Sequence, residues 1–264
     1  MAIQQIHGIK IVYEDIGEGN PLVFIHGHPF NRSMWREQIS TFSQRYRVIV
    51  PDLRGYGESE VVAEKTMLED FAQDIAAILD SLKVSKIILA GLSLGGQIVL
   101  EFYHLFPQRV HALILADTFA QLDSDEKRQE RYKIAERILK EGMNEYAKEL
   151  LPKMLAAKTI QEQPEVAEYL LNMMRTAPAK GAAAALRGRA ERQDYTPLLP
   201  QIAVPTLIVV GSEDQFTPVS DAEFMRARIP NSRVAVIEAT GHMPNLEKPA
   251  VFNNILNEFI KSLD

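Results

Sequence analysis

The stretch KIILAGLSLGGQIVL, residues 86–100, decides the fold. It begins as a short apolar run typical of a buried β-strand and ends with apolar side chains at helical spacing. Between the two, the segment GLSLG from Gly91 to Gly95 fits the pattern G-x-S-x-G. Ser93 therefore stands where a predicted strand turns into a predicted helix. We expect a strained turn that exposes the serine hydroxyl, with glycines on both sides because side chains there would collide with the strand and the helix.

The start of the predicted helix also points to an oxyanion hole. The first turn of a helix carries N–H groups that have no partner within the helix, together with the positive end of the helix dipole. A second tight loop, HGHP at residues 26–29, follows another β-like run. We expect the N–H groups of His28 and Leu94 to stabilise an oxyanion formed at Ser93, with about 3 kcal/mol from each donor.

A serine nucleophile needs a general base and a carboxylate that orients the base. His242 lies in EATGHMPNLEKP, directly after the last β-like run, and Asp214 lies in VVGSEDQFTP, directly after the penultimate one. The chain order Ser93, Asp214, His242 is the order used by α/β catalytic triads. Glu213 and Asp117 are rival carboxylates, and Asp117 fits better as a hydrogen-bonding group at the end of a strand.

His26 and His28 form an H-x-H pair, which is a weak pattern for a zinc site. The chain has no cysteine, and no acidic ligand lies close to this pair in the sequence. We therefore expect no metal and no cofactor. His26 is expected to be buried and bonded to the loop backbone.

The distribution of β-like runs divides the chain. In most of it, β-like runs alternate with amphipathic helices, which predicts an α/β fold with a mostly parallel sheet flanked by helices. His7-Gly8 joins the first two runs and predicts an antiparallel hairpin. We expect a core of residues 1–118 and 197–264. In residues 119–196 charged and alanine-rich helical patterns replace the β-like runs, and we expect an inserted helical cap there.

Composition excludes several classes of partner. The chain has 264 residues, 46% of them hydrophobic, and a formal net charge of −6. It has no long basic run, so neither nucleic acid nor an anionic membrane surface is an expected partner. A small-molecule substrate is expected instead. No apolar stretch approaches the length of a membrane span, and no secretory leader is recognisable, so we expect a cytoplasmic protein.

Five motifs carry a resemblance to a known family. HGHP, DLRGYGES, GLSLGG, GSEDQFTP and GHMPNLEKP, in this order, resemble the α/β-hydrolase fold superfamily, and most of all its small, lid-bearing bacterial carboxylesterases. Residues 182–214 are similar to proteins called 3-oxoadipate enol-lactonases. The resemblance covers the whole chain and implies an eight-stranded sheet with the cap after the sixth strand. Ser93 argues against haloalkane dehalogenases and epoxide hydrolases, which use aspartate there, and the chain lacks the HGGG run of a lipase-like branch.

The resemblance implies a serine hydrolase that forms an acyl-enzyme. A carboxylesterase acting on small to medium, largely apolar substrates is the main expectation. A lactonase similar to 3-oxoadipate enol-lactonases, or a related amidase or perhydrolase, is the alternative within the enzymes. A ligand sensor on the same fold is the alternative outside them.

The substrate pocket is expected between the sheet edge and the cap. Fixed cations there would suit a dicarboxylate lactone, and Arg187, Arg189 and Arg192 lie on a predicted cap helix whose orientation stays open. Apolar residues next to the motifs are expected to line the pocket: Phe30, Trp35, Leu92, Phe119, Val219 and Met243.

Overall fold

A computed structural model describes residues 1–62 and 64–263, and it contains a single eight-stranded sheet. The strand order is β1-β2-β4-β3-β5-β6-β7-β8, and neighbouring strands from β4 to β8 in this order are parallel. Strand β2 is antiparallel to both of its neighbours, β1 and β4. The predicted fold class is confirmed. The strands are β1 (Ala2–Ile6), β2 (Ile9–Ile16), β3 (Pro21–Ile25), β4 (Arg47–Pro51), β5 (Ile87–Leu92), β6 (Val110–Ala116), β7 (Thr206–Gly211) and β8 (Ser232–Ile237).

The predicted hairpin opens the sheet. Ile6 of β1 pairs with Ile9 of β2, and the two turn residues His7 and Gly8 have φ angles of 50° and 82°. Positive φ at both central residues is the type I′ pattern, whose twist matches that of the flanking strands. The hairpin prediction is therefore confirmed.

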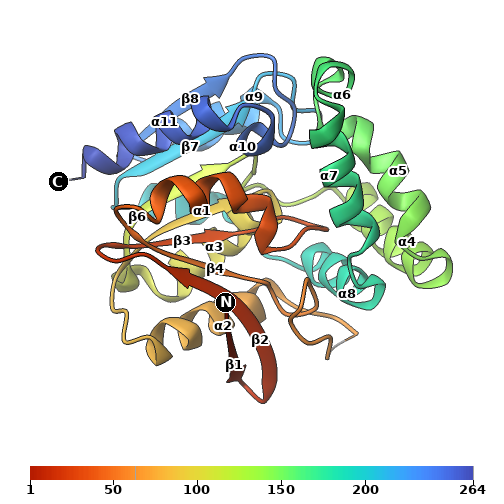
Figure 1. Cartoon of the computed structure of the whole chain (residues 1–264), viewed down its shortest axis with the longest axis horizontal. Coiled ribbons are helices and arrows are strands. Elements are labelled where there is room, and N and C mark those ends of the chain that lie inside the picture. Colours follow the sequence, from red (N-terminus) through yellow and green to blue (C-terminus); the bar gives the residue numbers. More distant parts are fainter. Residues whose placement is uncertain (63, 264) are drawn as a thin grey trace.

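Helices cover both faces of the sheet, so its central strands are buried on both sides. Every residue of β5 and β7 is buried, as expected for parallel strands between helical layers. In Figure 1, α1 and α11 lie in front of the sheet and α3 lies behind it. The core helices are α1 (Arg36–Phe42), α2 (Leu68–Ser81), α3 (Leu94–Leu105), α9 (Val219–Arg226), α10 (Pro244–Glu247) and α11 (Pro249–Lys261).

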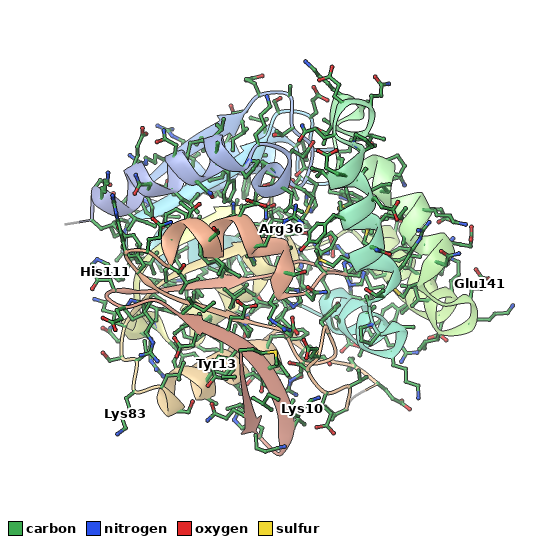
Figure 2. The ribbon with its side chains drawn as sticks, in the orientation of Figure 1. Lys10, Tyr13, Arg36, Lys83, His111 and Glu141 are labelled. Carbon is green, nitrogen blue, oxygen red and sulfur yellow. The ribbon has the colours of Figure 1, made fainter. Side chains whose placement is uncertain are left out.

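Polar and charged side chains occupy the outer surface. Lys83, His111 and Glu141 are exposed and extend away from the body of the molecule (Figure 2). Among the helices of the described residues, none is both long enough and apolar enough to cross a membrane.

Five α-helices and no strand lie between β6 and β7, a part of the chain that the structure describes throughout. They stand together at one end of the sheet in Figure 1. All five fall within the range 119–196 predicted as a cap. They are α4 (Asp125–Glu141), α5 (Met143–Met154), α6 (Ala157–Glu162), α7 (Pro164–Arg175) and α8 (Ala179–Ala190).

Helix α8 packs closely on the loop that follows β4. A Cβ atom at Gly181 would lie 1.7 Å from the carbonyl oxygen of Gly55, and one at Gly188 would lie 1.7 Å from that of Thr66. Thr66 also donates its N–H to the carbonyl oxygen of Ala184. Because glycine lets the two backbones touch, this contact determines which face of α8 points toward the sheet edge.

Candidate active site

Ser93 occupies a strained turn between β5 and α3. Its φ and ψ angles are 57° and −117°, a conformation that non-glycine residues rarely adopt. A Cβ at Gly91 would lie 2.3 Å from the carbonyl oxygen of Gly95, and a Cβ at Gly95 would lie 2.2 Å from that of Ile25. Both flanking positions therefore require glycine, for the reason expected from the sequence.

His242 and Asp214 form a buried hydrogen-bonded pair. His242 Nδ1 lies 2.7 Å from Asp214 Oδ2, and the imidazole donates because the carboxylate only accepts. Asp214 also accepts the N–H groups of Phe216 and Thr217, at 2.8 and 3.2 Å, and the hydroxyl of Thr217. Burial raises the pKa of Asp214, but the charge of His242 and these hydrogen bonds outweigh it and lower the pKa below its usual value. Asp214 therefore stays ionised.

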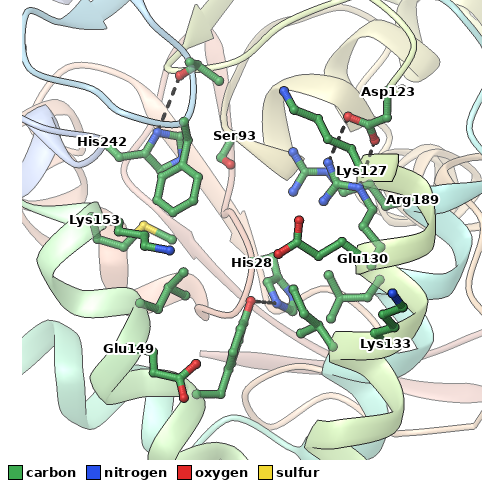
Figure 3. A pocket seen from close by; sticks show the side chains of 18 of the residues that line it. His28, Ser93, Asp123, Lys127, Glu130, Lys133, Glu149, Lys153, Arg189 and His242 are labelled. Atoms are coloured by element: carbon green, nitrogen blue, oxygen red, sulfur yellow. Dashed lines mark hydrogen bonds and ion pairs between the residues drawn. The ribbon is translucent and has the colours of Figure 1, made fainter. Parts of the chain in front are cut away.

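Ser93 and His242 line the same cavity. In Figure 3 the Ser93 side chain lies beside the His242 ring. Since Nδ1 of His242 is bonded to Asp214, Nε2 is the ring nitrogen left to take a proton. The tertiary structure thus brings together three side chains that are separated by 121 and 28 positions in the chain.

Asp117 lies at the end of β6 as a second buried carboxyl group. One polar atom from each of Asp117, Asp214 and His242 lies within 4.8 Å of the other two. Asp117 Oδ1 accepts the N–H of Gly211 at 2.9 Å, as expected of a strand-end group, while Oδ2 has no partner among the described residues. Burial and then the charge of Asp214 raise the pKa of Asp117 well above its usual value, which favours the protonated form. Glu213, the other rival carboxylate, is exposed.

Asp117, Asp214 and His242 are the one set of side chains within residues 1–62 and 64–263 whose spacing would suit a metal ion. Asp214 Oδ2 and His242 Nδ1 already bond to each other, and Thr217 bonds to the same oxygen. Two of the three groups are therefore already hydrogen-bonded to each other, an arrangement that suits proton transfer. His26, the weaker zinc candidate, is buried, and its two ring nitrogens bond to the backbone of Gly27 and Leu53.

The loop that carries His28 is the expected second half of the oxyanion hole. In the part of the chain that the structure describes, no acceptor is assigned to the N–H groups of His28 and Leu94. The His28 ring is held at Nδ1 by the Tyr56 hydroxyl, at 2.8 Å, and at Nε2 by the Tyr146 hydroxyl, at 3.2 Å. Burial and then the charge of Arg189 lower the pKa of His28 well below its usual value. The ring is therefore neutral and joins the core to cap helix α5.

The cavity has both apolar and charged lining residues, and most of the residues predicted to line it do not. Its volume is about 490 Å³, and of the six predicted lining residues only Phe119 lines it. Phe30, Trp35, Leu92 and Met243 are buried in the core instead, and Val219 packs against the core from α9. Proximity in sequence to a motif residue was a poor guide because neighbouring side chains of a strand or turn point to opposite sides.

Charged residues of the cap line much of the cavity, and Arg189 is the one among them that was named as a candidate from the sequence. Arg189 lines it, whereas Arg187 pairs with Glu136 outside it and Arg192 is buried against backbone carbonyl groups. The charged lining residues come from the start of the cap and from α4, α5 and α8: Asp123, Lys127, Glu130, Arg131, Lys133, Arg137, Glu149, Lys153 and Arg189.

Glu247, on α10, is a further residue of this region that sequence reasoning missed. Its buried carboxylate accepts the N–H of Gly241 at 2.7 Å, the N–H of Ala156 at 2.9 Å and the hydroxyl of Thr159 at 2.6 Å. It therefore binds the loop that carries the histidine to the start of α6. The motif GHMPNLEKP contains Glu247 but does not indicate its role, because its partners Thr159 and Ala156 lie 88 and 91 positions away in the chain.

Comparison with known proteins gives the same picture. A family profile described as the alpha/beta hydrolase fold matches residues 20–249. The chain is 29% identical over 255 residues to 3-oxoadipate enol-lactonase 2 of Acinetobacter baylyi, an alignment that covers 96% of this chain and 94% of that protein.

Two solved structures have closely similar backbones. A thermophilic esterase from Thermogutta terrifontis, studied with malate bound, superposes with a TM-score of 0.95 and 39% identity, over 97% of this chain and 94% of that one. An enol-lactonase from Burkholderia xenovorans LB400 shares the fold at a TM-score of 0.91 and 24% identity, over 98% of this chain and 100% of that one. The turn at Ser93, the eight-stranded sheet and the match over most of its length together show that the chain belongs to the α/β-hydrolase fold family.

Proposed function

We propose that the protein is a serine hydrolase that cleaves carboxylic esters and lactones through an acyl-enzyme, with Ser93, Asp214 and His242 as its catalytic triad. One observation carries the proposal: the Asp214–His242 pair and the strained Ser93 turn meet at one cavity. The esterase and enol-lactonases to which the chain is similar act on bonds of this class by their names.

Acylation follows from the roles of the three groups. Ser93 Oγ attacks the carbonyl carbon while Nε2 of His242 takes its proton, and Asp214 keeps the imidazole in the tautomer that has Nε2 unprotonated. The negative charge that develops on the carbonyl oxygen is stabilised by the N–H groups of His28 and Leu94, at about 3 kcal/mol for each donor. His242 then returns the proton to the leaving alcohol oxygen.

Deacylation uses the same groups with water as the nucleophile. His242 takes a proton from water, whose oxygen attacks the carbonyl carbon of the acyl-enzyme, and the oxyanion is again stabilised by the two N–H groups. The bond between the acyl group and Ser93 Oγ then breaks, His242 returns the proton to Oγ, and the carboxylic acid leaves. Every proton transfer in the cycle is assigned to one histidine, so the reaction as proposed needs no cofactor. Residues 119–196 act as the cap in this scheme, and their helices line the cavity that receives the substrate.

The proposal is tested by Ser93→Ala. Hydrolysis of a short-chain nitrophenyl ester is expected to fall by about 10⁶-fold, the scale seen when a triad serine is removed, while the circular dichroism spectrum and melting temperature stay the same. Ser85→Ala, at an exposed serine, is the matched control and is expected to keep full activity. Multiple turnovers by the wild type separate an enzyme from a sensor, which would give one stoichiometric burst. Retained turnover in Ser93→Ala contradicts the proposal.

A further inference from the structure

The cavity carries more positive than negative residues, although the whole chain has a formal net charge of −6. Six cationic and three anionic side chains line it. Arg131 is neutralised by Asp123 at 2.8 Å, and Arg137 by Glu149 at 2.7 Å. The third carboxylate, Glu130, is exposed and has no such partner in the lining. Four cations also have no such partner there, and the three lysines among them are exposed like Glu130. A hollow of this charge concentrates anions. Those four cations are Lys127, Lys133, Lys153 and Arg189.

Arg189 is the buried member of this group. Only 9% of its surface is exposed, its Nε donates to Gln97 Oε1 at 2.8 Å, and none of the ion pairs in the described residues includes it. Burial and then the charge of Arg131 lower the pKa of Arg189, and the charge of Asp123, which acts in the opposite direction, does not outweigh them, yet an arginine stays protonated near neutral pH. A buried cation without a counter-ion is costly, and an anionic ligand would offset that cost.

Arg189 and His242 lie on opposite sides of Ser93. Helix α8, which carries Arg189, is bonded through Ala184 to Thr66, in the connection that follows β4. His242 follows β8, and β5, which leads to Ser93, lies between β4 and β8 in the strand order. Figure 3 shows the same arrangement: Ser93 lies between the His242 ring and the Arg189 side chain.

The geometry of acyl transfer then separates the two halves of a substrate. The leaving alcohol oxygen must face His242, because that residue protonates it. The carbonyl oxygen must face the N–H groups of His28 and Leu94. The acyl chain takes the remaining direction, away from His242, and this is the side on which Arg189 lies.

We infer that the preferred substrates carry a second anionic group in their acyl part, as half-esters of dicarboxylic acids do, and that Arg189 is the residue that recognises it. The inference rests on the proposed function and adds the charge and the position of the recognised group. Arg189 binds the remote carboxylate through the guanidinium N–H groups that face the cavity, while Gln97 holds its Nε.

The wild-type enzyme tests the inference with pairs of esters that differ in one group. Monoethyl succinate is compared with ethyl butyrate, in which a methyl group replaces the carboxylate, and the glutarate and adipate half-esters are compared with their own neutral partners. The best half-ester is expected to exceed its neutral partner in kcat/KM by about 10- to 100-fold, the range for hydrogen bonds to charged groups, mainly through KM. O-Butyrylglycolate, whose carboxylate lies in the alcohol part, is expected to show no gain over ethyl butyrate.

Three variants test the role of Arg189. Arg189→Gln is expected to reduce the half-ester preference by about 10- to 100-fold. Arg187→Gln, on the same helix but paired with Glu136 outside the cavity, is expected to keep it. Glu130→Gln removes the lining carboxylate that has no ion-pair partner in the cavity and is expected to lower KM for the half-ester. If Arg189→Gln fails to fold, the wild type is tested instead by competitive inhibition with succinate and with butyrate. Stronger inhibition by succinate supports the inference, and equal or weaker inhibition contradicts it.

The two proposals fail in different ways. Wild-type hydrolysis of neutral esters at least as fast as half-esters overturns the inference and leaves the proposed function standing. If Arg189→Gln loses the same fraction of kcat/KM on half-esters and on neutral esters, Arg189 has a structural role and the inference is also overturned. Absence of hydrolysis of any ester or lactone, or full activity in Ser93→Ala, overturns the proposed function itself.

Discussion

His242 donates its backbone N–H to the carbonyl oxygen of Met154 at 2.9 Å. Met154 is the last residue of cap helix α5 and lines the same cavity as the imidazole. The candidate base and the cap are therefore bonded directly to each other. Because one hydrogen bond spans both parts, the position of the imidazole depends on how the cap is seated.

Glu247 strengthens this connection, and Glu247→Gln is expected to weaken it. The amide keeps one acceptor oxygen but places an NH₂ group against an N–H donor of Gly241 or Ala156. A buried donor without a partner costs about 1–3 kcal/mol, so the free energy of unfolding measured in urea should fall by that amount, and kcat should fall with it. Glu258→Gln, at an exposed glutamate of α11, is the control and should stay within about 0.5 kcal/mol of the wild type. Equal stability of the two variants would contradict the role of Glu247.

The two neighbouring carboxyl groups are expected to differ in catalysis. Asp214→Asn should lower kcat by about 10⁴-fold, since an amide at this place favours the wrong tautomer of His242. Asp117→Asn should lower kcat much less, because Asp117 bonds to the N–H of Gly211 and not to the imidazole. Nitrophenyl ester kinetics on the two variants make the comparison. A larger loss of kcat in Asp117→Asn than in Asp214→Asn would show that Asp117, and not Asp214, is the carboxylate that orients His242.

Asp117 should also produce a pH dependence of stability. Its pKa is raised by burial and by Asp214, so the folded protein keeps this proton to a higher pH than the unfolded chain does. The stability that the protonated group contributes is present at low pH and is lost as pH rises from about 4, the usual aspartate value, through the raised folded value. Asp117→Asn lacks this titration, so its free energy of unfolding should gain on that of the wild type as pH rises. Urea unfolding at several pH values between 4.5 and 8 measures the difference, and a constant difference would show that Asp117 keeps an ordinary pKa.

Helix α8 should tolerate no side chain at its contact with the core. An alanine in place of a helical glycine usually stabilises a protein, by about 0.5–1 kcal/mol. At Gly188 the added Cβ would lie 1.7 Å from the carbonyl oxygen of Thr66, so Gly188→Ala is expected to lower the free energy of unfolding by about 1–3 kcal/mol. Lys180→Ala, at an exposed position of the same helix, is the control. Thermal and urea unfolding measure the change in stability. A Gly188→Ala variant more stable than the wild type would show that α8 can move away from Thr66 without loss of stability.

Local patterns were enough to predict the sheet and the candidate triad. The run before Gly91, the glycines that flank Ser93 and the positions of Asp214 and His242 directly after β-like runs depend on neighbours in the chain. In a parallel sheet the carboxyl ends of neighbouring strands meet at one edge, so residues that follow those strands come together there. The same argument placed Asp117 near them, although only the structure shows which carboxylate bonds the imidazole.

The sequence by itself therefore determined the fold and the candidate groups for the chemistry, whereas only the tertiary structure decided what the cavity presents to a substrate. Phe30, Trp35 and Leu92 are apolar and close to the motifs, yet they face the core. Arg189 faces the cavity, because the glycine contact of α8 with the loop after β4 sets the rotation of that helix. Helix α8 is rich in small residues and has no single apolar face, so its orientation depends on packing against parts of the chain more than 100 residues away.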